Sequence, residues 1–200
     1  MANLVSAFRT LLAFGVLAML WWPTQTVYLW AFGLTTAVIV LDGVDGWVAR
    51  TFNESSKAGA LIDILGDRIV EQAYWIVFAV LGWVPVWVPL VVMTRGILVD
   101  GLRSLALEEG FTAFGQTSMM QSKLGVLLVS SRASRWLYAA CKAVAFAFVI
   151  LAHTPDFPAD VRLTVTAIAV TAVYGSVIFC VLRGLPVLME GKRFLGTASS

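Results

Sequence analysis

Four aspartates and one arginine stand out in a stretch of sequence that is otherwise mostly apolar: Asp42, Asp45, Arg50, Asp63 and Asp67. Carboxylates that lie close together in a partly dehydrated place repel one another, so a cation must lie among them or several must be protonated. Oxygen-only ligands suit hard divalent cations, and a guanidinium group binds phosphate well. The residue types therefore predict a divalent metal site that handles a diphosphate group.

The spacing of the aspartates predicts that two helices bring them together. Asp42 and Asp45 are three positions apart, and Asp63 and Asp67 are four apart, so each pair shares one face of a helix. The polar stretch 51–58 predicts the turn of an antiparallel hairpin. Reflection about the centre of this stretch sets position 42 opposite 67 and position 45 opposite 63 or 64. We therefore expect all four carboxylates at one level between the two helices.

Neighbouring residues favour a ligand site over a purely structural role. Gly43, Gly46 and Gly59 lower helix stability and leave room for a ligand to approach the backbone. The single histidine, His153, lies far along the chain, which argues against zinc. One aspartate alone could equally form a hydrogen bond between helices, but four at matching levels are poorly explained in that way.

The composition indicates a membrane protein. The chain has 200 residues, of which 60% are apolar and only 13% are charged, whereas about a quarter are charged in a typical soluble domain. These values exclude a soluble or disordered chain, and a net charge of +2 does not indicate a nucleic-acid partner. Cys141 and Cys180 lie in apolar stretches, so neither a disulfide framework nor a thiolate metal site is expected.

Charge-free runs predict an all-α polytopic membrane protein with one domain over residues 1–200. About 20 apolar residues cross a bilayer as a helix. Of the 14 Lys and Arg residues, only Arg162 falls on the side opposite the aspartates. The positive-inside bias then predicts cytoplasmic termini and a cytoplasmic active site. We also expect a location in the bacterial inner membrane. The six predicted helices cover about 4–22, 27–50, 59–82, 85–108, 134–153 and 163–184.

The aspartate window resembles the signature of the CDP-alcohol phosphatidyltransferase family, Asp-x2-Asp-Gly-x2-Ala-Arg-x8-Gly-x3-Asp-x3-Asp. The resemblance implies a membrane domain of about six spans that is a homodimer. It also implies transfer of a phosphatidyl group from CDP-diacylglycerol to an alcohol, with release of CMP, in phospholipid biosynthesis. Every fixed position of the signature is present, as Asp42, Asp45, Gly46, Ala49, Arg50, Gly59, Asp63 and Asp67.

The resemblance also implies a role for each matching residue. The four aspartates would bind Mg²⁺ or Mn²⁺, and Asp67 would also be the general base. The opening segment Asn3-Leu-Val-Ser6-Ala-Phe-Arg9 is similar to the family's Asn-x2-Thr-x2-Arg, with serine in place of threonine. The residues expected to contact the CDP group are Asn3, Ser6, Gly46, Arg50 and Gly59.

Four further arginines are candidates for binding the acceptor alcohol, which suggests that it carries a phosphate: Arg95, Arg103, Arg132 and Arg135. Arg95 and the pair Leu102-Arg103 are similar to the Arg-x6-Leu-Arg pattern of phosphatidylglycerophosphate synthases, although Gly96 stands where those enzymes commonly have glutamate. The first two arginines lie about 12 Å apart along a helix, too far to grip one phosphate unless their side chains converge. We therefore expect Arg103, Arg132 or Arg135 to hold the acceptor, while Arg95 contacts the diphosphate or a carboxylate.

Several alternatives remain at this point. Arg103 could simply form an ion pair with Asp100, three positions earlier. Glycerol 3-phosphate is the first expected acceptor, inositol phosphate the second, and serine or a second lipid the third. A cation- or proton-coupled transporter would also contain intramembrane carboxylates. However, the four aspartates are all expected at one membrane face, and none of them lies on a path to the opposite face.

Overall fold

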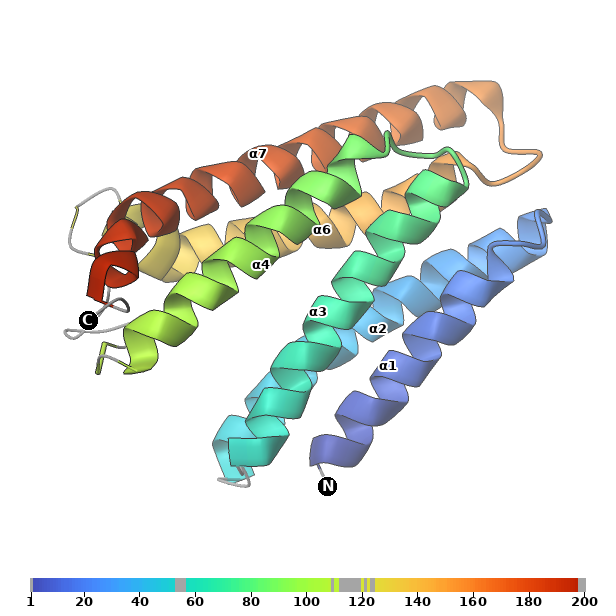
Figure 1. Cartoon of the computed structure of the whole chain (residues 1–200). Helices are drawn as coiled ribbons and strands as arrows, with labels where there is room; N and C mark the ends of the chain where they lie inside the picture. The colour runs from blue at the N-terminus through green and yellow to red at the C-terminus, as the bar shows by residue number, and fades with distance from the viewer. Residues whose placement is uncertain are drawn as a thin grey trace. The chain divides into compact units, whose positions relative to one another are not determined.

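A computed structural model shows an all-helical chain (Figure 1). It describes the backbone of residues 2–52, 57–108, 110–111, 120, 122 and 125–197, and the side chains of 6–41, 64–108, 110–111, 120, 122 and 125–192. These residues contain no strand, which confirms the predicted all-α class. The helices are α1 (Ala2–Met19), α2 (Gln25–Phe52), α3 (Lys57–Val80), α4 (Trp87–Glu108), the π-helical turn η1 (Val126–Ser130), α6 (Arg132–Ala152) and α7 (Ala159–Thr197).

The last predicted helix is wrong at its C-terminal end. We expected it to end near residue 184, but α7 continues to Thr197 with Pro186 inside it. A proline removes one backbone hydrogen bond and strains the preceding turn. The helix continues because the next residue, Val187, is fully buried in an apolar core. Side-chain packing outweighs the local penalty here.

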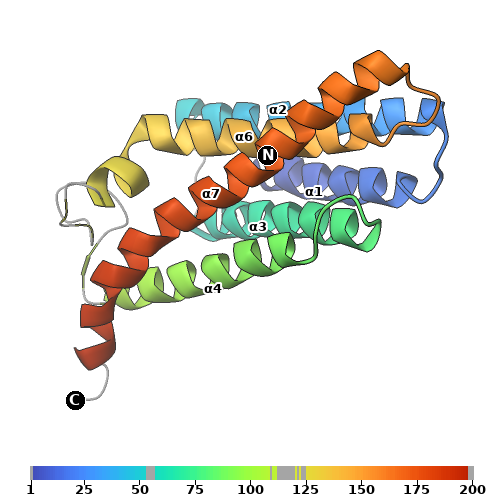
Figure 2. The same cartoon turned by 90° about the horizontal axis from the view of Figure 1, so that it is seen from above.

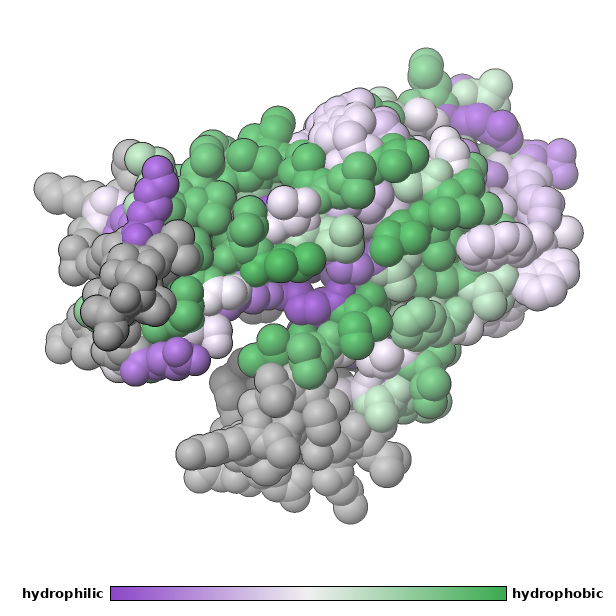
Figure 3. Space-filling model, viewed as in Figure 1, coloured by the Kyte–Doolittle hydropathy of each residue, from purple (hydrophilic) through white to green (hydrophobic). Residues whose placement is uncertain are grey.

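Among the residues whose side chains are described, two helices are long and apolar enough to cross a membrane, Arg132–Ala152 and Ala159–Lys192. Ser6–Met19 and Gln25–Leu41 are shorter apolar segments within the part of the chain whose side chains are described. Many large apolar side chains on the helices are exposed, and Figure 3 shows apolar residues over much of one face. These features indicate a membrane protein, while the six-span topology remains a prediction.

The chain divides into two compact units. The first unit comprises residues Met1–Val86 and Ala143–Thr171, and in it α1 packs against both α2 and α3 (Figures 1 and 2). The second comprises Trp87–Lys142 and Ala172–Ser200.

Aromatic side chains form the centre of the first unit. Tyr74, Trp75 and Phe78 of α3 are almost completely buried. The ring of Tyr74 stacks on Phe146 with a centroid distance of 4.8 Å, and its hydroxyl lies 3.0 Å from the hydroxyl of Thr35 on α2. Ring packing and this buried hydroxyl pair therefore fix α3 against its neighbours.

The turn after α3 confirms the predicted break between the helices 59–82 and 85–108. Gly82 has a φ of 74°, a left-handed conformation that glycine adopts without strain. Its N–H donates to the carbonyl of Ala79, and the N–H of Trp83 donates to the carbonyl of Phe78. This pair of hydrogen bonds is a Schellman motif, which satisfies carbonyls that the helix end would otherwise leave unpaired.

The second unit has its own apolar core. A close helix approach extends it, because a Cβ at Gly191 would lie 2.8 Å from Leu102 Cδ1. The absence of a side chain at this position lets α7 lie against α4. The buried residues of the core are Val99, Leu102, Ala106, Met120, Val129 and Val187.

Candidate functional site

The four signature aspartates lie on two helices, as the spacing predicted. Asp42 and Asp45 belong to α2, and Asp63 and Asp67 belong to α3. Helical backbone at these positions supports the expected sharing of faces within each pair. The side chains of Asp42, Asp45 and Asp63 lie outside the described residues, as do those of Asn3, Gly46, Arg50 and Gly59. Among the described side chains, no group of three or more His, Cys, Asp or Glu residues comes together.

Asp67 forms an ion pair with Arg9 of α1. The side chain of Arg9 is only 3% exposed, whereas that of Asp67 is 46% exposed. A buried guanidinium requires a nearby negative charge, and this contact supplies it. The pair therefore holds the partly exposed carboxylate of Asp67 against α1.

A close approach between α1 and α3 positions this pair. A Cβ at Gly66 would lie 3.2 Å from the Oγ1 of Thr10, which donates a hydrogen bond of 2.9 Å to the carbonyl of Ser6. Ser6 itself is buried. A glycine directly before Asp67 thus lets the two helices come close enough for Arg9 to reach the carboxylate.

Arg9 was missing from the expected set of functional residues. Its signal was present in the sequence, because it is the final residue of the segment Asn3-Leu-Val-Ser6-Ala-Phe-Arg9. The spacing shows that Arg9 lies near the start of an apolar helix. It does not show that the guanidinium is buried against an aspartate nearly 60 positions later.

The second unit contains a buried arginine, Arg183 of α7, which is 6% exposed. Its Nη1 donates a 2.7 Å hydrogen bond to the Oγ of Ser134 on α6, and its Nη2 donates to the carbonyl of Val129 at 3.4 Å. Its guanidinium also lies over the ring of Tyr138, 5.7 Å from the centroid. The Ser134 hydroxyl is fixed in turn by donating to the carbonyl of Leu128 at 2.6 Å.

Positive charges gather around Arg183. The charges of Arg95 on α4 and Arg135 on α6 both act on it. Three arginines from three helices repel one another, and an anion bound among them would relieve this repulsion. Guanidinium groups bind phosphate through paired, charge-assisted hydrogen bonds. This cluster is therefore suited to a phosphate group.

The four arginines expected to bind the acceptor fall into different surroundings. Arg95 and Arg135 belong to the cluster around Arg183. Arg103 lies 3.9 Å from Asp100, so the ion pair considered for it is present. Arg132, the first residue of α6, is exposed.

Sequence reasoning missed Arg183 and Ser134. Arg183 directly follows the charge-free run from Leu163 through Leu182, near the end of the predicted helix 163–184, and was not among the candidate site residues. Its burial depends on contacts with Ser134 and Val129, about 50 positions earlier. Spacing along one helix cannot reveal such contacts.

Comparison with known proteins identifies the family. A family model described as CDP-alcohol phosphatidyltransferase matches residues 1–182. The chain belongs to the CDP-alcohol phosphatidyltransferase family. Proteins of this family use a CDP-linked donor, an alcohol acceptor and divalent metal ions.

The curated relatives carry two kinds of name. A protein of Mycobacterium tuberculosis (strain H37Rv) named as a cardiolipin synthase is 37% identical over 89 residues, or 42% of this chain and 43% of the relative. One from the same strain named as a phosphatidylglycerophosphate synthase is 28% identical over 80 residues, or 40% and 38%. The CDP-diacylglycerol–glycerol-3-phosphate 3-phosphatidyltransferase of Bacillus subtilis is 34% identical over 62 residues, or 31% and 32%. The chain thus spans less than half the length of these relatives.

The donor set fits a hard divalent metal. Aspartates at three- and four-residue spacings on α2 and α3 offer oxygen ligands alone. The accessible carboxylate of Asp67 is held in place by Arg9, which a ligand residue needs. These residues are consistent with the metal dependence of the family.

Proposed function

We propose that this enzyme transfers a phosphatidyl group from CDP-diacylglycerol to glycerol 3-phosphate and releases CMP. The observation that carries the choice of acceptor is the arginine cluster around Arg183, which suits an acceptor that bears a phosphate. The name of the Bacillus subtilis relative includes the same acceptor. A phosphate on the acceptor would offer these guanidinium groups a charged hydrogen-bond partner, which an uncharged acceptor lacks.

The donor binds at the signature residues in this proposal. Asp42, Asp45, Asp63 and Asp67 would hold one or two Mg²⁺ or Mn²⁺ ions, which neutralise the diphosphate and stabilise the departing phosphate. The CDP group would contact Asn3, Ser6, Gly46, Arg50 and Gly59.

Asp67 acts as the general base in this proposal. The acceptor oxygen forms a bond to the phosphorus of the phosphatidyl group, and the bond from that phosphorus to the CMP oxygen breaks. The hydroxyl proton passes to the carboxylate of Asp67, which lies at hydrogen-bonding distance from the acceptor during the reaction. Arg9 is a positioning residue, because it contacts Asp67 and fixes the direction of its carboxylate.

The acceptor phosphate binds to Arg135 and Arg183 in this proposal. Ser134 orients Arg183 by accepting a hydrogen bond from its Nη1. Arg95, Arg103 and Arg132 remain predictions for the acceptor site. Arg103 is the weakest of these, because Asp100 already offsets its charge.

A second candidate is transfer to a lipid acceptor, as in cardiolipin formation. The relative named as a cardiolipin synthase shares 37% identity over 89 residues and favours this possibility. Inositol phosphate would also satisfy the arginine cluster, whereas serine would not. We further propose the six-span topology, cytoplasmic termini and active site, a bacterial inner-membrane location and a homodimer.

Release of CMP from CDP-diacylglycerol by the purified enzyme in detergent tests the proposed function. Separate reactions contain glycerol 3-phosphate, phosphatidylglycerol, inositol phosphate, serine or no acceptor. We expect the fastest release with glycerol 3-phosphate and formation of phosphatidylglycerophosphate. Faster transfer to serine would overturn the phosphorylated acceptor, and absence of CMP release with every acceptor would overturn the choice of donor.

A further inference from the structure

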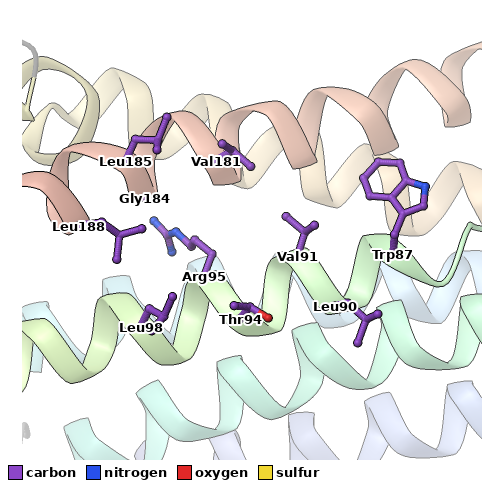
Figure 4. Close-up of a pocket in the computed structure, with 10 residues that line it drawn as sticks. All are labelled: Trp87, Leu90, Val91, Thr94, Arg95, Leu98, Val181, Gly184, Leu185 and Leu188. Atoms are coloured by element: carbon purple, nitrogen blue, oxygen red, sulfur yellow. The ribbon is translucent and has the colours of Figure 1, made fainter.

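An elongated apolar groove runs between α4 and α7 in the second unit (Figure 4). Its volume is about 350 Å³, and its walls include Trp87, Val91, Leu98, Val181 and Leu185. Trp87, Leu98, Val181 and Leu185 are exposed along the groove, which is therefore open along one side. A membrane protein with such an opening presents it to lipid chains rather than to water.

Arg95 supplies the charge in this otherwise apolar groove. Figure 4 shows its side chain directed from α4 toward α7, beside Gly184 and Leu188. A Cβ at Gly184 would lie 2.8 Å from the Cγ of Arg95, so the glycine makes room for this side chain. The Nε of Arg95 is buried, and no described residue accepts a hydrogen bond from it. A buried donor without an acceptor is costly, which points to an acceptor on a ligand.

We propose that this groove binds one acyl chain of an anionic membrane phospholipid, with the lipid phosphate on Arg95. The groove lining matches the chain, and the buried Nε matches a phosphate oxygen. The positive charge of Arg95, with no carboxylate among the residues that line the groove, favours an anionic lipid over a zwitterionic one.

The length of the groove agrees with this occupant. Trp87 and Arg95 both line it and are eight residues apart on α4, which corresponds to roughly 12 Å along the helix. One leaflet of a bilayer contains about 15 Å of hydrocarbon. A lipid with its phosphate beside Arg95 can therefore place most of one acyl chain along the groove toward Trp87. This binding site is independent of the identity of the acceptor alcohol, because it requires no transfer reaction.

The test uses phosphatidylglycerol with a photoactivatable diazirine in one acyl chain. The full chain is placed in phosphatidylcholine nanodiscs, labelled under light, and analysed by peptide mapping. We expect crosslinks at groove residues such as Trp87, Val91 and Val181. Equal labelling of exposed apolar residues outside the groove, without enrichment at these positions, would overturn the proposal.

Two pairs of variants separate the contributions of charge and space. Arg95→Gln is expected to lower phosphatidylglycerol affinity at least about tenfold, as loss of a charge-assisted hydrogen bond does. Its control, Lys192→Gln, removes an exposed charge of α7 that does not line the groove. Leu185→Trp fills the groove and is expected to reduce labelling severalfold, whereas Leu182→Trp places the same ring on an exposed position outside it.

Thermal unfolding of each variant in the same nanodiscs checks its folding. Leu98→Phe is a milder second filling variant if Leu185→Trp unfolds. Wild-type labelling in both Arg95→Gln and the folded filling variant would overturn the proposal. Equal affinity of the wild type for phosphatidylglycerol and phosphatidylcholine would overturn the assignment of Arg95 to an anionic lipid. Neither readout depends on catalysis, so a failure of the proposed transferase reaction remains distinguishable.

Discussion

Replacement of Arg183 by glutamine tests the proposed acceptor site most directly. A guanidinium has five N–H groups. In Arg183, one of these donates to Ser134 and one to the Val129 carbonyl, while its buried Nε has no acceptor among the described residues. Donors therefore remain for a phosphate after the structural hydrogen bonds are formed. Glutamine keeps a polar side chain but removes the charge and most of these donors.

The expected effect follows from the energy of one charge-assisted contact. Such a hydrogen bond contributes about 1.5–3 kcal/mol, which corresponds to roughly a ten- to hundredfold change in affinity. We expect Arg183→Gln to raise KM for glycerol 3-phosphate by this factor and to change KM for CDP-diacylglycerol less than about twofold. Loss of the bond to Ser134 also destabilises the fold by about 1 kcal/mol, so the assay temperature must lie well below Tm.

The assay measures CMP release while one substrate varies and the other is saturating. Arg183→Lys should recover part of the acceptor affinity, because a point charge replaces the planar fork. Ser134→Ala should raise the acceptor KM less, since it removes a positioning hydrogen bond and no charge. Arg103→Gln is a comparison from the same unit, and we expect a smaller effect there because Asp100 already offsets its charge. An unchanged acceptor KM in folded Arg183→Gln enzyme would refute this assignment.

Three further predictions concern the metal, the general base and the protonation of His153. Chelation with EDTA should abolish CMP release and Mg²⁺ or Mn²⁺ should restore it, so full activity after rigorous chelation would contradict the metal site. Asp67→Asn should retain CDP-lipid binding, measured by equilibrium binding, and lose at least about a hundredfold in turnover, because an amide cannot accept the hydroxyl proton. Stacking of the His153 ring on Trp83 at 4.5 Å desolvates the ring, and this burial together with the charge of Arg162 lowers its pKa below the usual 6.5. As the pH falls, His153 is protonated in the unfolded chain before it is protonated in the folded chain. The contribution of neutral His153 to stability is therefore present above about pH 6.5 and decreases below that value. Thermal melts between pH 5 and 7.5 should show a weaker pH dependence in His153→Gln.

The helices were predictable because most of their signals are local. Charge-free runs located the six long helices approximately but not the π-helical turn η1, and Gly82 lies at the turn between two of the predicted helices. The end of α7 was not predictable in this way, because its continuation past Pro186 depends on the burial of Val187 against residues from other helices. The local cost of a proline does not predict where a helix ends when tertiary packing compensates for that cost.

In the candidate site, too, local features were predictable from the sequence and long-range contacts were not. The placement of the signature aspartates on α2 and α3 followed from spacing within each helix. The contacts of Arg9 with Asp67 and of Arg183 with Ser134 join residues 58 and 49 positions apart. Arg103 shows the opposite case, since its local ion pair with Asp100 was foreseeable from a three-residue spacing. An arginine that is buried by residues far away in the sequence can be recognised only in the folded structure.

Burial of Arg183 also bears on the class of acceptor. Removing a guanidinium from water is costly unless hydrogen bonds and opposite charges replace the lost hydration. Among the described residues, the hydrogen-bond partners of Arg183 are a serine hydroxyl and a backbone carbonyl, which carry no formal charge, while the charges of Arg95 and Arg135 oppose it. Two neutral partners replace only part of the hydration that a buried guanidinium loses. A phosphate beside Arg183 would add a negative charge, which favours a phosphorylated acceptor over serine or free inositol.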